Sequence, residues 1–300
     1  MIATMFPADF AYARADSLEH ALCLLSEAQA DGDDAKLLAG GQSLLPMMKL
    51  RLAAPQTLID IGGLTELRGV ARGADGTTIK ALTTYRALQR DPRIAAAFPA
   101  MTDALAVLAD QQVRARGTVG GCVAHGDPAA DLPAVLLALD AQVTLTSAAG
   151  SRTTPLDSFL QGVFATDLAG DEIVTAVTIP ASPVGSAYEK FEQPASHLPL
   201  AGVCAVVTVE NQVITSARVA VTGVAARPFR ALDAERSLVA ARPEPDSLAA
   251  AAAAVTAGVR PLSDQHASGP FRLHLARVLA RRALERAVSR AATVRSGRGC

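Results

Sequence analysis

The stretch that decides the fold is Ala39-Gly-Gly-Gln-Ser-Leu-Leu-Pro-Met-Met-Lys-Leu-Arg51, which follows a short predicted strand at 36–39. Consecutive glycines can adopt positive φ angles, and they let backbone N–H groups approach a ligand without interference from a Cβ atom. Ser43 adds a hydroxyl donor beside Gly40 and Gly41, as a phosphate site requires. Taken alone, this glycine pair more often marks a tight turn without a ligand.

A second glycine segment, Arg116-Gly-Thr-Val-Gly-Gly121, has the same character, with Thr118 as its hydroxyl donor. We expect Gly120 and Gly121 to form a turn, and two such loops can hold a pyrophosphate from both sides. Neither glycine pair matches a P-loop or the G-x-G-x-x-G dinucleotide fingerprint. The first segment also lacks the G-x-S-x-G pattern of a hydrolase nucleophile.

Hydrophobic periodicity and turn residues predict a mixed fold around these two segments. Asp16 is expected to cap the first helix, with Glu19 three residues later. Expected strands lie at 36–39, 57–61, 77–82, 143–146, 172–179, 203–210 and 213–224, and expected helices at 18–25, 99–108, 133–139, 246–259 and 271–292. Strands precede helices beyond Pro180 and Pro183, so we expect a domain boundary there and an α+β arrangement after it.

Composition excludes several classes of protein. The 300 residues include 28 Lys and Arg against 29 Asp and Glu, so the net charge of −1 gives no electrostatic case for a nucleic-acid partner. Half of the residues are hydrophobic and 19% are charged, which excludes intrinsic disorder. Aromatic residues make up only 4%, too few for a surface that stacks bases.

The spacing of the cysteines indicates whether the chain has a metal site, and the length of its apolar stretches indicates whether it crosses a membrane. Cys23, Cys122, Cys204 and Cys300 lie far apart without a C-x-x-C pair, so no zinc or iron–sulfur site is expected. The N-terminus lacks the features of a signal peptide. The longest apolar stretch, 248–259, is too short to span a bilayer. We therefore expect a cytoplasmic protein that is not transmembrane.

The full sequences of both glycine segments are similar to those of a known protein family. Residues 39–51 and 116–133 resemble the first and second flavin-binding loops of the medium subunits of bacterial molybdenum hydroxylases. Tyr188-Glu-Lys-Phe-Glu-Gln-Pro-Ala-Ser-His197 resembles the segment that opens the family's C-terminal domain. The resemblance runs in order from about Phe10 to Arg290. The family comprises FAD subunits of carbon monoxide dehydrogenase, quinoline oxidoreductase, nicotine dehydrogenase and xanthine dehydrogenase.

The resemblance implies a fold and a set of FAD contacts. The fold is α+β: an FAD-binding PCMH-type domain at 1–180, with subdomains at about 1–62 and 63–180, and a C-terminal α+β domain of the carbon monoxide dehydrogenase flavoprotein type at 181–300. The implied FAD contacts are Leu38, Ala39, Gly40, Gly41, Gln42, Ser43, Leu44, Thr118, Val119, Gly120, Gly121, Cys122, Asp131, Val174 and Lys190. No catalytic side chain and no metal ligand is implied in this chain, because the flavin carries the electron chemistry.

One position departs from the family. Cys122 stands where the family usually has Asn directly after the second glycine pair. An amide donates and accepts hydrogen bonds, whereas a thiol does both weakly. Cys122 therefore either alters the behaviour of the flavin or serves only as a small space-filling side chain.

The resemblance also implies partners. A large subunit would carry molybdopterin and hydroxylate the substrate, and a small subunit would carry two [2Fe-2S] clusters. This chain would pass electrons from the nearer cluster through FAD to an external acceptor, in a dimer of heterotrimers. The sequence of residues 191–197 favours an aromatic N-heterocycle or aldehyde as substrate. The alternatives are a stand-alone FAD-dependent oxidoreductase acting on a small molecule, and a flavin-free binding or assembly protein.

Other ionisable residues invite a functional interpretation that their context does not favour. His125 is expected to be a structural histidine rather than a flavin attachment point or a base. His197 lies beside Ser196 without an arranged acid, so a hydrolase triad is not expected. Asp127 precedes Pro128 and is expected to cap a helix. The arginines of the last helix are expected on a solvated face or against acidic partner residues.

Overall fold

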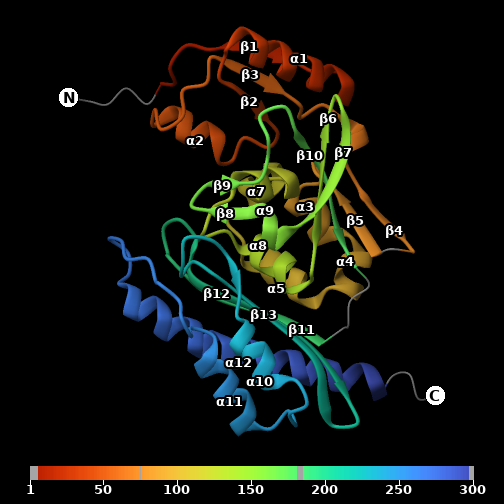
Figure 1. Cartoon of the computed structure of the whole chain (residues 1–300), viewed down its shortest axis with the longest axis vertical. Coiled ribbons are helices and arrows are strands. Elements are labelled where there is room, and N and C mark those ends of the chain that lie inside the picture. The colour runs from red at the N-terminus through yellow and green to blue at the C-terminus, as the bar shows by residue number, and fades with distance from the viewer. Residues whose placement is uncertain (1–5, 75, 181–184, 297–300) are drawn as a thin grey trace.

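The computed structural model describes residues 6–74, 76–180 and 185–296, which form three larger sheets, one two-stranded sheet and the helices packed on them (Figure 1). The first sheet is parallel, in the order β1-β3-β2, and α1 covers it. Leu22 and Leu25 of α1 pack on Ile59 of β3 in its core. The elements are β1 (Ala11–Arg14), α1 (Leu18–Asp31), β2 (Ala35–Leu38), α2 (Leu44–Lys49) and β3 (Thr57–Asp60).

The predicted cap of the first helix is wrong by one residue. Ser17 is the N-cap of α1, and its side chain accepts a hydrogen bond from the His20 N–H at 3.0 Å. Asp16 instead contacts the His20 ring, with 2.7 Å between Oδ1 and Nδ1. A serine hydroxyl next to the first turn reaches an N3 amide as readily as an aspartate does, so two adjacent candidates could not be separated by sequence.

The second sheet has the order β4-β5-β10-β6-β7, and all its pairs are antiparallel. Helices of the same region pack on one face of it, and a small β8-β9 hairpin lies beside α7 (Figure 1). The strands are β4 (Val70–Gly73), β5 (Gly76–Lys80), β6 (Gln142–Ser147), β7 (Gly150–Pro155), β8 (Leu160–Gly162), β9 (Ala165–Thr166) and β10 (Ile173–Ile179). The helices are η1 (Thr65–Leu67), α3 (Tyr85–Arg90), α4 (Pro92–Ala97), α5 (Pro99–Val107), α6 (Gln111–Arg116), α7 (Val119–His125), α8 (Asp131–Ala138) and α9 (Leu156–Phe159).

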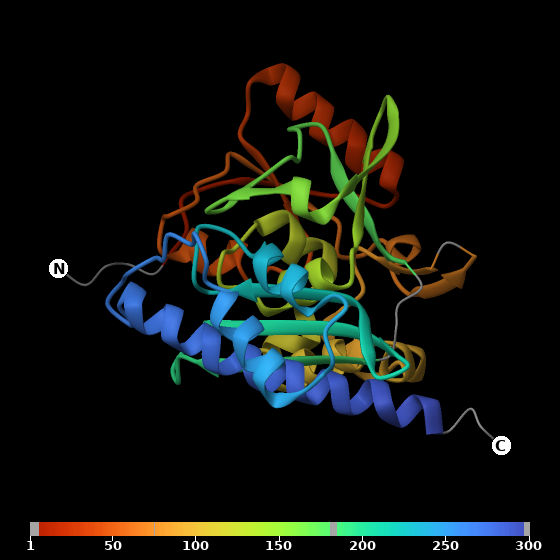
Figure 2. The ribbon, with the colours of Figure 1, turned by 60° about the horizontal axis from the view of Figure 1, so that its bottom comes forward.

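The third sheet is antiparallel, in the order β11-β12-β13-β14, and the long helix α12 lies across one face of it (Figure 2). The elements are β11 (Gly185–Glu192), β12 (Pro199–Glu210), β13 (Val213–Thr222), β14 (Phe229–Arg230), α10 (Leu232–Leu238), α11 (Pro245–Ala254) and α12 (Gly269–Ser296). Strands followed by helices confirm the predicted α+β class. The expected boundary after residue 180 adjoins 181–184, which lie outside the described residues.

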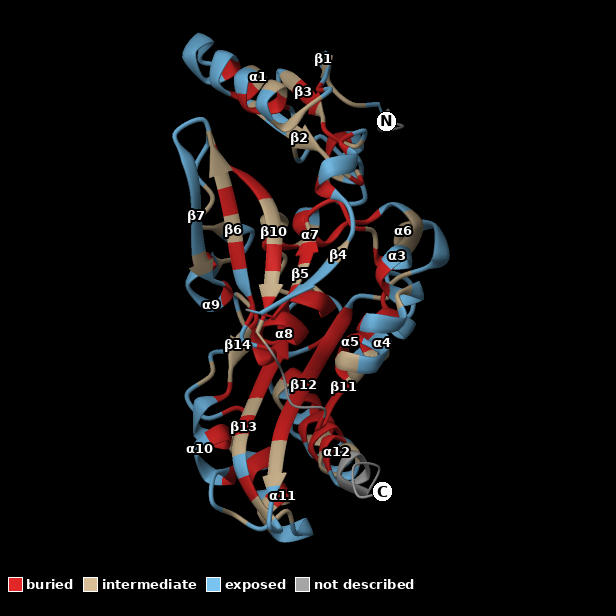
Figure 3. Cartoon of the chain, turned by 90° about the vertical axis from the view of Figure 1, so that its right-hand side faces the viewer, coloured by how far each residue is buried: buried red, intermediate tan, exposed pale blue. Residues whose placement is uncertain are grey.

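Both faces of the third sheet are buried. Val203 and Ala205 of β12 pack into the core formed with α11 and α12, whereas Cys204 and Val206 pack into the core that contains α5 and α8. Every residue of α8 is buried between the second and third sheets, and Figure 3 shows α8 in the buried colour. This central helix contacts α7, which contains Gly120 and Gly121, and it also contacts β12 and β13 of the third sheet. None of the described helices has the length and apolarity to cross a membrane.

Candidate functional site

The two glycine segments touch each other. A Cβ atom added at Gly40 would lie 2.1 Å from the Arg116 carbonyl oxygen and 3.1 Å from the Gly117 Cα atom. One added at Gly121 would lie 3.9 Å from the Ala39 Cβ atom. The absence of a side chain at Gly40 is therefore what allows segments more than seventy residues apart to meet. The sequence predicted two loops, and the structure brings them into one site.

The first segment presents unsatisfied backbone donors. Gly41 has a φ of +74°, and Ser43 precedes the six-residue helix α2. Within the described part of the chain, the N–H groups of Gly41, Gln42 and Ser43 have no hydrogen-bond acceptor. Successive free N–H groups beside a left-handed residue form an anion-binding concavity. The first segment therefore has the donor set that a phosphate group requires.

The second segment is built differently from the expected turn. Gly120 and Gly121 lie in the first turn of α7 with ordinary φ angles, after the N-cap Thr118, whose hydroxyl accepts from the Gly121 N–H at 3.2 Å. The Val119 and Gly120 N–H groups donate to the carbonyls of Thr83 and Ala81, at 3.1 and 2.8 Å. The expectation of a second turn with free backbone donors is wrong, because the chain following β5 takes those donors.

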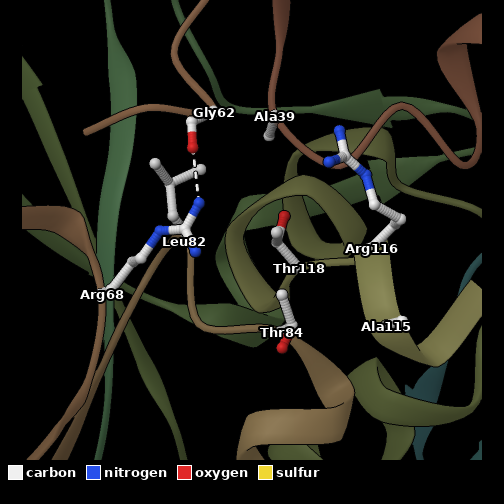
Figure 4. A pocket seen from close by; sticks show the side chains of 8 residues that line it. All are labelled: Ala39, Gly62, Arg68, Leu82, Thr84, Ala115, Arg116 and Thr118. Atoms are coloured by element: carbon white, nitrogen blue, oxygen red, sulfur yellow. Dashed lines mark hydrogen bonds between the residues drawn. The ribbon is translucent and has the colours of Figure 1, made fainter. Parts of the chain in front are cut away.

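A pocket of about 70 Å³ lies where the two segments meet (Figure 4). Ala39 and Gly62 face it from the first sheet, and Thr84 and Thr118 face it from the second region. Arg68, Leu82, Ala115 and Arg116 complete the lining. The volume suits a phosphate group and is far too small for a whole dinucleotide. Sequence reasoning missed Gly62, Arg68 and Thr84, which carry no motif of their own.

Cys122 is half-buried in α7, where its thiol hydrogen-bonds to the hydroxyl of the buried Tyr85. Burial raises the pKa of the Cys122 thiol to about 12, while the hydrogen bond with Tyr85 opposes this rise. The thiol is therefore protonated near neutral pH and is not a reactive thiolate. It lies one residue from Gly121, whose open side faces the first segment.

Asp131 and Lys190 form a buried pair that joins α8 to β11. The Lys190 Nζ lies 3.1 Å from Asp131 Oδ2, and it also donates to the carbonyls of Val107 and His197, at 3.1 and 2.6 Å. The Tyr188 hydroxyl donates to the other Asp131 oxygen at 2.7 Å. Burial raises the pKa of Asp131 to about 6 against the pull of Lys190. All three ammonium protons of Lys190 have acceptors within the protein, so this pair serves the domain junction in this structure.

A larger cavity of about 720 Å³ adjoins this pair between α5 and β11. Its ionisable side chains are bonded within the chain. Asp103 accepts from Arg286 at 2.9 Å, and His197 contacts Glu192 at 3.2 Å. Arg114 donates to the carbonyls of Leu108 and Ala109. Among the described residues that line this cavity, each acid or base therefore has a partner within the chain.

Val174, the remaining predicted contact, lies in β10 opposite Leu145 and is buried in the core beside α7. Its side chain is only 5% exposed, so any contact with a ligand would involve its backbone or a change of packing. The other predicted positions, Leu38 and Leu44, flank the first glycine segment at the end of β2 and the start of α2.

Several other sequence expectations are settled by local contacts. His125 ends α7, and its ring contacts the Phe164 ring with 4.9 Å between centroids and an interplanar angle of 38°. The Ser196 hydroxyl accepts from the Leu198 N–H and makes no bond to His197, so no triad forms. Asp127 is not a helix cap, because it accepts from the Ala129 N–H and α8 begins only at Asp131.

The arginines of α12 are less solvated than expected. Arg286 and Arg290 both bind Asp103 of α5, and Arg290 does so with two 2.7–2.9 Å contacts. Arg272 is buried and donates to the carbonyls of Leu200 and Gly223. Acidic partners lie within this chain, which the helical pattern of α12 alone cannot reveal. Within the described ranges, no group of three or more His, Cys, Asp or Glu residues is placed to hold a metal ion.

Comparison with known proteins supplies the family. Residues 8–182 match the model of the FAD binding domain in molybdopterin dehydrogenase, and residues 186–287 match that of the CO dehydrogenase flavoprotein C-terminal domain. The 6-hydroxypseudooxynicotine dehydrogenase complex subunit alpha of Paenarthrobacter nicotinovorans is 37% identical over 96% of this chain and 97% of its own length.

Solved structures agree with these matches. A chain of carbon monoxide dehydrogenase from Hydrogenophaga pseudoflava has a TM-score of 0.91 at 37% identity, covering 95% of this chain and 99% of that one. A chain of quinoline 2-oxidoreductase from Pseudomonas putida 86 has a TM-score of 0.89 at 30% identity, covering 95% and 99%. These findings confirm the predicted FAD-binding fold and flavoprotein C-terminal domain. The chain belongs to the family of FAD-binding medium subunits of molybdenum hydroxylases.

Proposed function

We propose that this chain receives electrons from a [2Fe-2S] subunit and passes them to an external acceptor, while a molybdenum subunit hydroxylates an aromatic N-heterocycle or an aldehyde. We propose further that it works in the cytoplasm within a dimer of heterotrimers, and that its domains divide at about residues 62 and 180. The contact between the two glycine segments, with three free N–H donors on one of them, is the observation that carries the proposal.

The residues at the site fit FAD. The N–H groups of Gly41, Gln42 and Ser43 would hold a phosphate group, and the Thr118 hydroxyl, which accepts from Gly121, retains a proton to donate. Val119 and Gly120 would support the site by packing, since their N–H groups are already used. Asp131 and Lys190 would contact FAD only by exchanging partners. Bound FAD supplies the electron chemistry, since it can hold the two electrons that arrive singly.

Electron transfer is favoured over substrate chemistry in this chain. Among the eight residues that line the pocket, Arg68 and Arg116 are the only ionisable ones. An arginine keeps its proton and so does not act as a general acid or base. A stand-alone oxidoreductase would need such a group beside its flavin. The phosphate-sized pocket supplies no such group, and the similarity to a subunit of a dehydrogenase complex favours electron transfer.

The test compares the purified chain with the complex purified from its native host. We expect the chain alone to contain FAD without iron or molybdenum, and candidate aldehydes or N-heterocycles not to bleach its flavin absorbance. The complex should contain all three centres, and its flavin should be reduced by the true substrate. Reduction of the isolated chain by such a substrate would instead support a stand-alone oxidoreductase.

Cys122→Asn is expected to retain the fold and FAD while shifting the flavin potential. An amide restores a stronger donor, and a charge-assisted hydrogen bond to the reduced cofactor contributes about 1.5–3 kcal/mol. For a two-electron couple, 1.4 kcal/mol corresponds to about 30 mV, so we expect a shift of at most some tens of millivolts. A redox titration of both proteins measures it. Indistinguishable potentials would leave Cys122 as a space-filling partner of Tyr85.

A further inference from the structure

The pocket has a positively charged side chain on each of two opposite sides. Arg68 follows η1 on one side and Arg116 ends α6 on the other, and Figure 4 shows their side chains on opposite sides of the gap above Thr118. No acidic side chain lines this pocket among the described residues. Two like charges across a small polar pocket repel each other unless an anion lies between them.

Neither arginine is neutralised by the protein. Within the described residues, Arg116 is exposed and its side chain makes no hydrogen bond or ion pair. Arg68 donates one N–H to the Gly62 carbonyl at 2.5 Å and pairs with no carboxylate. The neighbouring acid is Asp60, whose two oxygens accept from the Gly62 N–H and the Tyr12 hydroxyl, both at 2.7 Å. Guanidinium donors on both arginines therefore remain available to a ligand.

We infer that Arg68 and Arg116 form a two-sided clamp for the diphosphate of a dinucleotide. The inference rests on the proposed FAD function and deepens it. The N–H donors of Gly41, Gln42 and Ser43 carry no net charge, so Arg68 and Arg116 supply the positive charge that this pocket offers to a diphosphate. A guanidinium presents a planar fork that binds two phosphate oxygens at once. One arginine on each side of the pocket lets the same diphosphate be held from two directions.

The test uses the whole chain, stripped of FAD and titrated with FAD and with ADP as a diphosphate probe that lacks the flavin. Arg68→Gln and Arg116→Gln should each raise the Kd for FAD about tenfold, as expected when one charge-assisted hydrogen bond is lost. The Kd for ADP should rise by a similar factor. Arg116→Lys keeps the charge and should recover part of the loss.

Two matched controls are available. Arg90→Gln on α3 and Arg72→Gln on β4 remove exposed arginines that do not line the pocket, and both should bind FAD like the wild type. Added salt should weaken FAD binding by the wild type more than by the Arg68→Gln/Arg116→Gln double variant, since salt screens the charges of the clamp.

The possible outcomes distinguish a failure of the arginine clamp from a failure of the proposed FAD function. Wild-type affinity for FAD and ADP in both glutamine variants would overturn the clamp and leave the proposed function intact. A loss for FAD without a loss for ADP would also overturn it, because the arginines would then act away from the diphosphate. A wild-type chain that binds no FAD would overturn the proposed function itself.

Discussion

Gly41→Val is expected to give a folded chain that retains little FAD. Gly41 has a φ of +74°, which costs a residue with a Cβ about 1–2 kcal/mol. A side chain there would also lie 2.9 Å from the Leu45 Cδ1 atom. Valine at this position would relieve the backbone strain and the contact with Leu45 by rotating the backbone. That rotation would turn the N–H groups of Gly41, Gln42 and Ser43 away from their common direction. The flavin-to-protein absorbance ratio measures the effect, and circular dichroism checks the fold.

Gly32→Val is the matched control. Gly32 ends α1 with a φ of +76° and has nothing within 4 Å of an added Cβ atom, so it suffers the same backbone strain away from the site. We expect this variant to lose stability but keep its FAD. Equal flavin content in both variants would show that the first glycine segment does not hold the cofactor. Gly120→Val is a poor probe, because its side chain would lie 2.4 Å from the Ala81 Cβ atom and disrupt packing.

Asp131→Ala is expected to lower the free energy of unfolding by about 3–5 kcal/mol, the usual cost of removing one partner of a buried ion pair. Its partner Lys190 has a side chain only 3% exposed and would keep only the more distant Glu192 carboxylate, at 3.8 Å, as a counter-charge. The Tyr188 hydroxyl would also lose its acceptor. Urea unfolding at neutral pH, with FAD at a fixed saturating concentration, measures the change.

Asp233→Ala provides the comparison for that loss. Asp233 pairs with Arg236 on the surface of α10, where both side chains are more than half exposed. Such pairs contribute about 0–1 kcal/mol, so this variant should unfold close to the wild type. Similar losses in the two variants would show that the junction between α8 and β11 does not depend on the Asp131–Lys190 pair.

Local signals in the sequence predicted most of the regular structure. The strands β2 and β3 and the helices α5, α11 and α12 form near their expected residues, because apolar spacing and turn residues specify them locally. The strand β12 was expected too, but its burial on both faces was not. That burial depends on α8 lying against one face and α12 against the other, which no local pattern encodes.

In the candidate site, too, local sequence predicted some features, whereas others depend on tertiary packing. The glycine segments were located from their sequences, and Gly41 has the positive φ angle that consecutive glycines permit. The turn expected at Gly120 is wrong, because this residue lies in the first turn of α7 and its N–H donates to the Ala81 carbonyl from a distant part of the chain. Arg68 was missed for a related reason. Its place in the pocket follows from the packing of one sheet against another, and no motif surrounds it.

The central claim is that this chain holds FAD between its two glycine segments, and the flavin content of the purified wild-type chain tests it most directly. Released flavin can be identified by chromatography and its amount compared with the protein concentration. We expect one FAD per chain, displaced in part by excess ADP because both ligands would occupy the same phosphate site. A folded chain that contains no flavin, and takes up none when FAD is added, would contradict the account.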